Sequence, residues 1–247
     1  MHRFFSLLAR VSLLLLGLFF SSLSLGQSTP SPEVTRGVTW LAAQVTSTGQ
    51  LVNDTQSIAT PFQTRVEAAL ALRLLNTLPS LLVTAVGAEQ DDPTEYLARK
   101  AIILSMNGAD TSQILASLLN RQNSDGGFGA ANAFNSGAYD TAWAVLALTQ
   151  LGQSPGPNAI QARAYLRTVQ QIDGGIGEGS DAQRLIETAF AAFAFRTGTE
   201  AASLAAAQSA VNYLKLSQLA DASWASSLYV TATVWTAISS DIERGLI

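Results

Sequence analysis

The sequence predicts an all-α fold built from about four helix–turn–helix repeats, and two observations carry that prediction. A seven-residue motif occurs at 122–128, 170–176 and 218–224; glutamine begins it, aspartate follows three residues later, and an apolar residue ends it. Its turn position moves from Gly126 to Gly174 to Ala222 in two equal steps of 48 residues. Equal steps of that length are typical of helical-repeat proteins. Apolar residues also recur every three to four positions between the motifs, which indicates helices.

Nine helices are expected from this periodicity, and no stretch shows the sustained alternation that is typical of a β-strand. They cover residues 34–45, 61–77, 94–106, 110–121, 138–150, 157–170, 182–196, 199–216 and 226–240. Segments rich in glycine, proline and short polar residues separate them. The segment 78–93 is among these connections and is expected to be a loop.

The helices on the two sides of each turn differ in character. Those that follow a turn share an alanine-rich pattern, seen at 140–148, 187–195 and 230–238 and more weakly at 67–72. They are apolar nearly all round, which predicts burial. Those that precede a turn mix apolar and charged residues, as in 163–167 and 213–215, and are expected to be partly exposed. Stacked side by side, such units make two concentric layers, an α/α toroid or an open arc of one.

The first of the four sequence repeats is degenerate. Gly49 takes the turn position, but Val45 replaces the glutamine and Thr48 the aspartate. The interval from Gly49 to Gly126 exceeds one repeat by 29 residues. The excess is either a worn repeat or an insertion.

Each residue of the turn motif has a structural role to play. Gly126 and Gly174 allow positive φ in a tight reversal. An aspartate can bond the backbone two residues on, and a glutamine can bind free N–H groups of the next inner helix. The final apolar residue is expected to pack between units. The residues concerned are Gln122, Asp125, Gly126, Phe128, Gln170, Asp173, Gly174, Gln218, Asp221 and Trp224.

The repeated motif resembles the glutamine–tryptophan repeat of squalene–hopene and oxidosqualene cyclases, and residues 138–143 resemble a segment of class II terpene cyclase domains in plants. Related repeats occur in protein prenyltransferase β subunits, in complement and α-macroglobulin thioester domains and in cobalamin carriers, all of which are α/α toroids. The resemblance covers about residues 34–240. It implies the toroid fold and favours no single member of the superfamily.

The functional residues of these relatives mostly do not carry over. The cyclases use an Asp-x-Asp-Asp acid, which this chain lacks; Asp91-Asp92 before Pro93 reads as a helix-start signal. The prenyltransferase zinc site needs cysteine and histidine, but the chain has no cysteine and its one histidine is His2. The same lack excludes the Cys-Gly-Glu-Gln thioester and a serine–histidine or cysteine–histidine nucleophile. No metal and no cofactor are therefore expected.

Carboxylates remain as candidate site residues. Glu67, Asp140 and Glu187 occupy equivalent places, expected at the starts of inner helices on one rim. They could form an acidic mouth that binds a cation or supplies an acid, or they could simply favour helix N-termini. Tyr139 and Tyr229 stand one residue before this position in two of the copies. They could line a ligand mouth or pack on the neighbouring turn.

Residues 1–26 have the order of a secretory signal peptide, with His2 and Arg3 before the apolar run 11–20 and small or polar residues after it. Residues 27–247 are expected to form one toroid-like domain of an exported protein. Hydrophobic residues make up 48% of the chain, enough for a core, and the net charge of −4 gives no basic footprint for nucleic acid.

Two functions are compatible with these observations. The first is a non-catalytic binding or scaffold module that uses the rim and the inter-unit loops, which differ in length. Its partner would be another exported protein, or a second copy meeting the open flanks of an arc. The second is a divergent terpene-cyclase-like enzyme or an isoprenoid-binding protein, with Asp140 or Glu187 as acid.

Overall fold

A computed structural model describes residues 32–51, 59–74 and 77–242, and these residues are predominantly helical. The chain divides into two compact units, one ending at Leu115 and the other beginning at Ala116, and each is described by itself. The signal segment predicted at 1–26 lies outside the described residues. Among those described, no helix combines the length and the apolar character that crossing a membrane requires.

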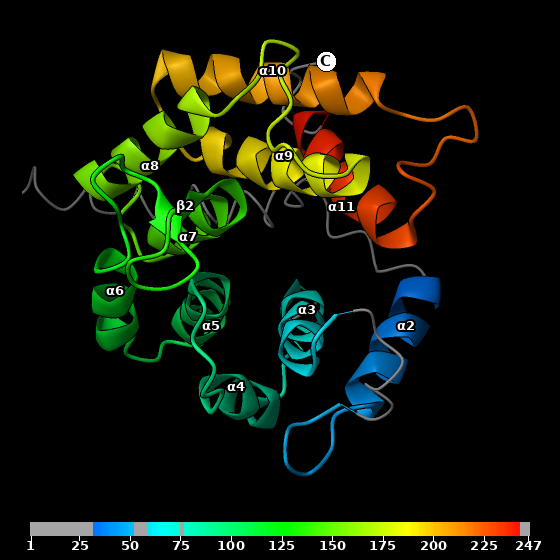
Figure 1. Ribbon diagram of the computed structural model, residues 1–247. Coiled ribbons are helices and arrows are strands. Elements are labelled where there is room, and N and C mark those ends of the chain that lie inside the picture. Colours follow the sequence, from blue (N-terminus) through cyan, green and yellow to red (C-terminus); the bar gives the residue numbers. More distant parts are fainter. Residues whose placement is uncertain (1–31, 52–58, 75–76, 243–247) are drawn as a thin grey trace, which may run out of the picture. The chain divides into compact units, whose positions relative to one another are not determined.

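The first unit holds four helices, α2 (Pro32–Ala43), α3 (Pro61–Leu74), α4 (Ser80–Gly87) and α5 (Thr94–Met106) (Figure 1). Its core forms where α3, α4 and α5 pack together. The largest fully buried apolar side chains of this core are Phe62, Leu72, Leu82 and Ile103.

The loop predicted at 78–93 is wrong in its first half, because α4 lies there. Pro79 precedes the helix in an extended conformation, which suits a helix start. Leu82, Val83 and Val86 are buried against the core of the unit. A helix of eight residues is too short for its apolar periodicity to be distinguished from an apolar loop, so tertiary burial decides the helix here.

The second unit contains five long or medium helices and a short hairpin. Helix α6 (Ser112–Leu119) crosses the boundary between the units. The hairpin pairs β1 (Phe128–Gly129) with β2 (Ser136–Gly137) in antiparallel register. The helices are α7 (Ala138–Gln150), α8 (Pro157–Thr168), α9 (Asp181–Arg196), α10 (Ala201–Leu216) and α11 (Leu228–Ile242). Their bounds lie within a few residues of those predicted.

Helix α9 is the centre of this unit, since it packs against α7, α10 and α11 (Figure 1). Its alanines at 189, 191, 192 and 194 are fully buried, as are those of α7 at 142, 144 and 147. Burial of these two inner helices is as predicted. Helix α11 differs, because Tyr229 is 37% exposed and Trp235 58% exposed. It packs against α9 and α10 on one side, so its apolar sequence is only half buried.

The turn motif adopts the same hydrogen bonds each time it occurs. In the second turn, Asn123 N–H donates to Gly127 O at 2.8 Å and Gly126 N–H donates to Asn123 O at 2.9 Å. The aspartate role is confirmed, because Asp125 Oδ1 accepts from Gly127 N–H at 2.9 Å. Corresponding backbone bonds recur at 46–50, 171–175 and 219–223, and the aspartate bond recurs at Asp173 and Asp221.

The partner predicted for the glutamine is wrong. Gln122 Nε2 donates to Gly126 O at 2.9 Å and to Asn158 O, at the start of outer helix α8, at 2.8 Å. Gln170 Nε2 does the same to Gly174 O and to Ala206 O of α10. The amide therefore donates to the next outer helix, and it is a threonine of the inner helix that bonds the turn.

That threonine is Thr141 in α7 and Thr188 in α9. Thr141 Oγ1 accepts from the buried Phe128 N–H at 2.8 Å, and Thr188 Oγ1 accepts from the Ile176 N–H at 2.8 Å. Thr231 repeats the bond to Trp224 N–H at 3.0 Å. Phe128, Ile176 and Trp224 are themselves buried, as predicted for the last position of the motif.

Candidate functional site: a pocket between two turns of the second unit

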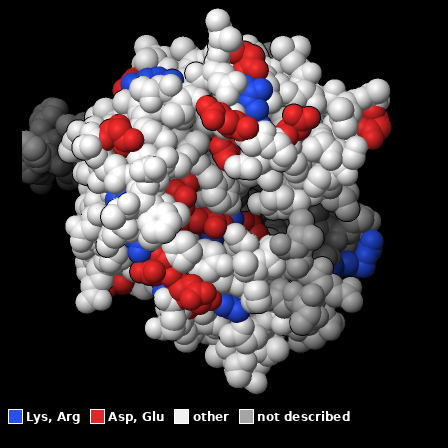
Figure 2. Space-filling model, viewed as in Figure 1, with Lys and Arg blue, Asp and Glu red and all other residues white. Residues whose placement is uncertain are grey.

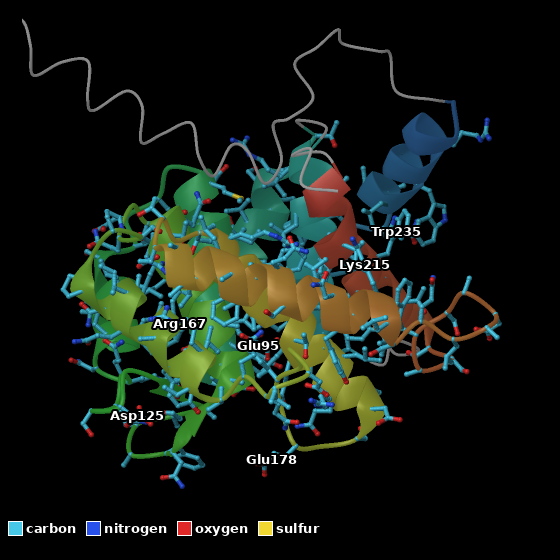
Figure 3. The ribbon with its side chains drawn as sticks, turned by 90° about the horizontal axis from the view of Figure 1, so that it is seen from above. Glu95, Asp125, Arg167, Glu178, Lys215 and Trp235 are labelled. Atoms are coloured by element: carbon cyan, nitrogen blue, oxygen red, sulfur yellow. The ribbon has the colours of Figure 1, made fainter. Side chains whose placement is uncertain are left out.

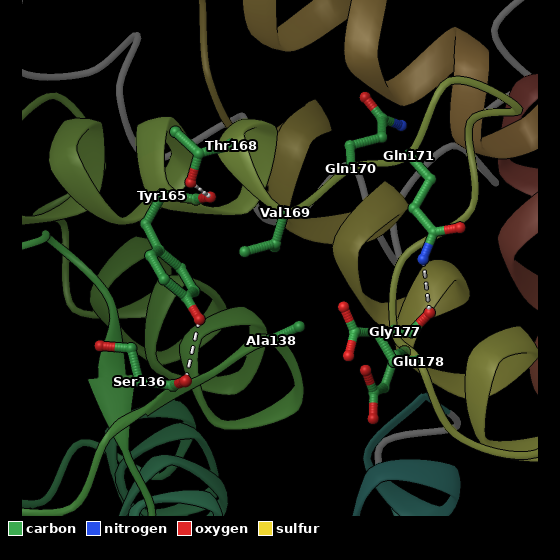
Figure 4. Close-up of a pocket in the computed structure, with 10 residues that line it drawn as sticks. Ser136, Ala138, Tyr165, Thr168, Val169, Gln170, Gln171, Gly177 and Glu178 are labelled. Atoms are coloured by element: carbon green, nitrogen blue, oxygen red, sulfur yellow. Dashed lines mark hydrogen bonds between the residues drawn. The ribbon is translucent and has the colours of Figure 1, made fainter.

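A pocket with a volume of about 520 Å³ lies in the second unit, between the hairpin that follows the Gly126 turn and the loop that follows the Gly174 turn (Figure 4). We call it the rim pocket. Its lining combines polar, apolar and acidic groups: Ser136, Ala138, Tyr165, Thr168, Val169, Gln170, Gln171, Gly177, Glu178 and Glu187. Figure 4 shows Ser136 and Tyr165 on one side, facing Gln171, Gly177 and Glu178 on the other.

The first wall is held by Tyr165 near the end of α8. Its hydroxyl donates to Ser136 O in β2 at 2.9 Å. The Ser136 hydroxyl in turn donates to Asp125 Oδ1 at 2.8 Å and accepts from Asn123 Nδ2 at 2.9 Å. The second turn, the hairpin and α8 are thereby fixed to one another, and the tyrosine ring presents an apolar side to the pocket.

The second wall is the loop that leads from the third turn into α9. Gln171 Nε2 donates to Gly177 O at 3.0 Å, which closes this loop. Gly177 has a φ of +100°, and a Cβ added there would lie 2.5 Å from Glu187 Oε2. The missing side chain at Gly177 leaves room for the Glu187 carboxylate, which accepts from Gln183 Nε2 at 2.8 Å.

The pocket is negatively charged. Glu178 and Glu187 both line it, and the adjacent cation, Arg184, is engaged elsewhere. Arg184 donates to Asp173 Oδ1 at 2.7 Å and its guanidinium lies 4.6 Å from the centre of the Tyr213 ring. This negative charge acts on Tyr165 in the first wall. Burial raises the pKa of Tyr165, and the nearby charges of Asp125 and Glu187 raise it further.

The turns of this unit carry exposed acids, and Arg184 pairs with one of them, Asp173. Asp125, Asp173 and Glu178 are exposed on the turn side, while Arg163 is buried and paired with Glu200. Figure 3 shows Asp125 and Glu178 at one edge of the unit and Lys215 set back from it. On the face seen in Figure 2, acidic side chains are spread widely and basic side chains show in fewer places. A cation approaching the pocket would meet a favourable potential.

Glu187 is the predicted carboxylate that lines the rim pocket. Its expected position at a helix start is wrong, since α9 begins six residues earlier at Asp181, with Ser180 as N-cap. Glu67 likewise stands six residues into α3. The macrodipole acts within the first turn, so it does not account for either residue. Asp140 does lie in the first turn of α7.

The other residues predicted for the rim, Glu67, Asp140, Tyr139 and Tyr229, lie outside the pocket lining. Tyr139 packs edge-on against Phe190, with ring centres 5.4 Å apart, and contacts Trp143 at 6.5 Å. In the first unit, Glu67 pairs with the buried Arg99 at 2.5 Å. Tyr229 is on the exposed side of α11.

Sequence reasoning did not single out Glu178 or Tyr165 as pocket residues. Glu178 has no counterpart in the other copies of the motif, so no repetition pointed to it. Tyr165 carried a signal, because a tyrosine stands nine residues before the turn position in two units. In the described part of the chain, no three acidic, histidine or cysteine side chains gather in a way that could hold a metal ion.

No protein-family model matches this chain, and no curated protein is significantly similar to it. The functional argument therefore rests on the geometry of the rim pocket and of the turns.

Proposed function

We propose that this chain is an exported, non-catalytic binding module with an α/α-toroid-like fold, and that the rim pocket is where it binds. The observation that supports this proposal is the pocket itself, which strand β2, the third turn with the loop after it, and helices α7, α8 and α9 build together. Loops on one rim of a repeat fold are where such proteins usually place recognition.

The repeat architecture is supported by what packs on each turn. The Gly126 turn bonds to α8 and the Gly174 turn to α10. The Gly49 turn lies against α4 in the same way, since a Cβ at Gly49 would clash with the backbone of Leu81. Helices α4 and α5 thus correspond to the outer and inner helices on the two sides of a turn, but no glycine turn motif joins them. This pair accounts for the excess of 29 residues as a worn repeat.

A binding role fits the chemistry of the pocket better than a catalytic one. The Tyr165 hydroxyl and the Gln171 amide are both committed to structural hydrogen bonds. The mature chain expected after residue 26 has neither histidine nor cysteine, the commonest general base and the most reactive nucleophile. What the pocket offers a ligand is shape, an apolar wall and two carboxylates.

The test is native mass spectrometry of the protein isolated from its own source, with two variants. Ala138→Trp fills the pocket with an indole without changing its charge; Ala202→Trp, on the exposed side of α10, is the matched control. We expect a bound protein or lipid on the wild type and on the control, lost from Ala138→Trp. A complex that survives Ala138→Trp would overturn the rim pocket as the site. Turnover of an isoprenoid substrate would overturn the non-catalytic assignment.

A further inference from the structure

We infer that the rim pocket receives the cationic side chain, lysine or arginine, of a polypeptide segment. This inference rests on the proposed binding function and names the ligand chemistry of the same site. Its basis is the way the pocket combines carboxylates, an apolar wall and exposed apolar flanks.

Charge comes first. Among the described residues, neither Glu178 nor Glu187 forms a salt bridge, and the side-chain bond of Glu187 is to the neutral Gln183 amide. Carboxylates that face a partly enclosed space are best matched by donors that carry a positive charge. Among the described residues Arg184 forms no salt bridge with either glutamate; its Nη2 donates to Gln171 Oε1 and to Asp173 Oδ1, each at 2.7 Å.

Shape favours an organic cation. The ring of Tyr165 and the aliphatic groups of Ala138 and Val169 also line the pocket, and Figure 4 shows the Tyr165 ring on the side opposite Glu178. Lysine and arginine match a pocket that is apolar in one part and acidic in another, since their apolar stems carry a charged end. A bare calcium ion takes about six to eight oxygen ligands, more than two glutamates provide.

The flanks favour a polypeptide over a free amine. Ile172, next to the lining residue Gln171, is 108% exposed, and Phe134, two residues before Ser136, is 61% exposed. One exposed apolar residue needs no explanation, but two at the tips of the loops that border one pocket offer contacts to the neighbours of an inserted side chain.

The probe is the blocked pentapeptide Leu-Gly-Lys-Gly-Leu, compared with the same peptide acetylated on the lysine Nζ. Binding to the full mature chain is followed by amide NMR shifts, in particular those of Gly177 and Glu187. We expect the lysine peptide to shift both signals and the acetylated peptide to leave them unchanged. The double variant Glu178→Gln, Glu187→Gln is expected to weaken binding about tenfold, as the loss of two charge-assisted bonds implies. Asp221→Asn, which removes one negative charge in the fourth turn, outside the pocket lining, should bind as the wild type does.

Three results would overturn the inference. The two peptides could bind equally, the double variant could bind as well as the control, or calcium chloride alone could produce the same shifts. In each case, a native complex still lost from Ala138→Trp would leave the proposed binding function standing. Failure of both tests would remove the rim pocket as a site altogether.

Discussion

Replacing Gly126 by alanine tests the idea that each turn is locked under the next outer helix. Gly126 has a φ of +87°, and an added Cβ would lie 2.7 Å from Gln161 O and 3.1 Å from Gln161 Cβ in α8. The left-handed conformation costs alanine about 1–2 kcal/mol. Forcing α8 away adds about 1–3 kcal/mol, the usual range for overpacking. Alanine also lowers the conformational entropy of the unfolded chain, which offsets about 0.4–1 kcal/mol of this loss of stability.

We therefore expect Gly126→Ala to lower the free energy of unfolding by about 2–4 kcal/mol. Gly152→Ala is the matched control, because Gly152 has a φ of +73° but no atom within 4 Å of an added Cβ. Gly152→Ala should lower the free energy of unfolding by about 1 kcal/mol, which measures the cost of the left-handed conformation without any steric contact. Urea unfolding of the mature chain, followed by circular dichroism, measures both.

Equal losses in Gly126→Ala and Gly152→Ala would refute the reasoning, since the contact with α8 would then contribute nothing. The chain already contains an internal comparison. Ala222 stands at the equivalent position of the fourth turn with a φ of 66°, and it is exposed. Alanine is tolerated there because the close approach of a helix is missing among the described residues. Ala222→Gly should change stability by no more than about 1 kcal/mol.

Three further predictions concern hydrogen bonds and charge. Thr188→Val should cost about 1–3 kcal/mol in urea unfolding, because it leaves a buried turn N–H without an acceptor, and Thr188→Ser should restore most of the loss. Gln170→Ala should lower the free energy of unfolding by about 1 kcal/mol and Gln218→Ala by less, because within the described residues the exposed Gln218 Nε2 bonds only its own turn; equal losses would contradict the role assigned to the inter-helix bond. Glu200→Ala should cost about 3 kcal/mol, since it strands Arg163, which is 1% exposed. Burial raises the pKa of Glu200, but the Arg163 hydrogen bond and the other nearby groups outweigh it and leave the pKa below its ordinary value of 4.5. Its contribution to stability is therefore complete above that value and lost as the pH falls through the folded pKa, so Glu200→Gln should show a smaller loss of stability on acidification below about pH 4.5.

The turn motif explains why so much of the helical structure was predictable. Asp125 bonds its own turn, and Thr141 bonds the turn from the next helix, so both act through local or nearly local geometry. The period of 48 residues then repeats this geometry, and helix bounds follow from it. The resemblance to toroid proteins and the export signal stay predictions.

The rim pocket was only partly predictable. Glu187 was found because it repeats the position of Asp140, but Glu178 belongs to a loop without a repeat. The glutamine partners were missed because Gln122 and Asn158 are 36 residues apart and meet only when α8 packs on the turn.

The sequence by itself determined the turns, the burial of α7 and α9 and the helices other than α4, because hydrophobic periodicity and turn chemistry act between residues close in the chain. Tertiary structure alone decided that α4 is a helix, that α11 is half exposed, and that Tyr165 faces Glu178 and Glu187 across a pocket. Those outcomes depend on which surfaces packing leaves open, and no local pattern encodes that.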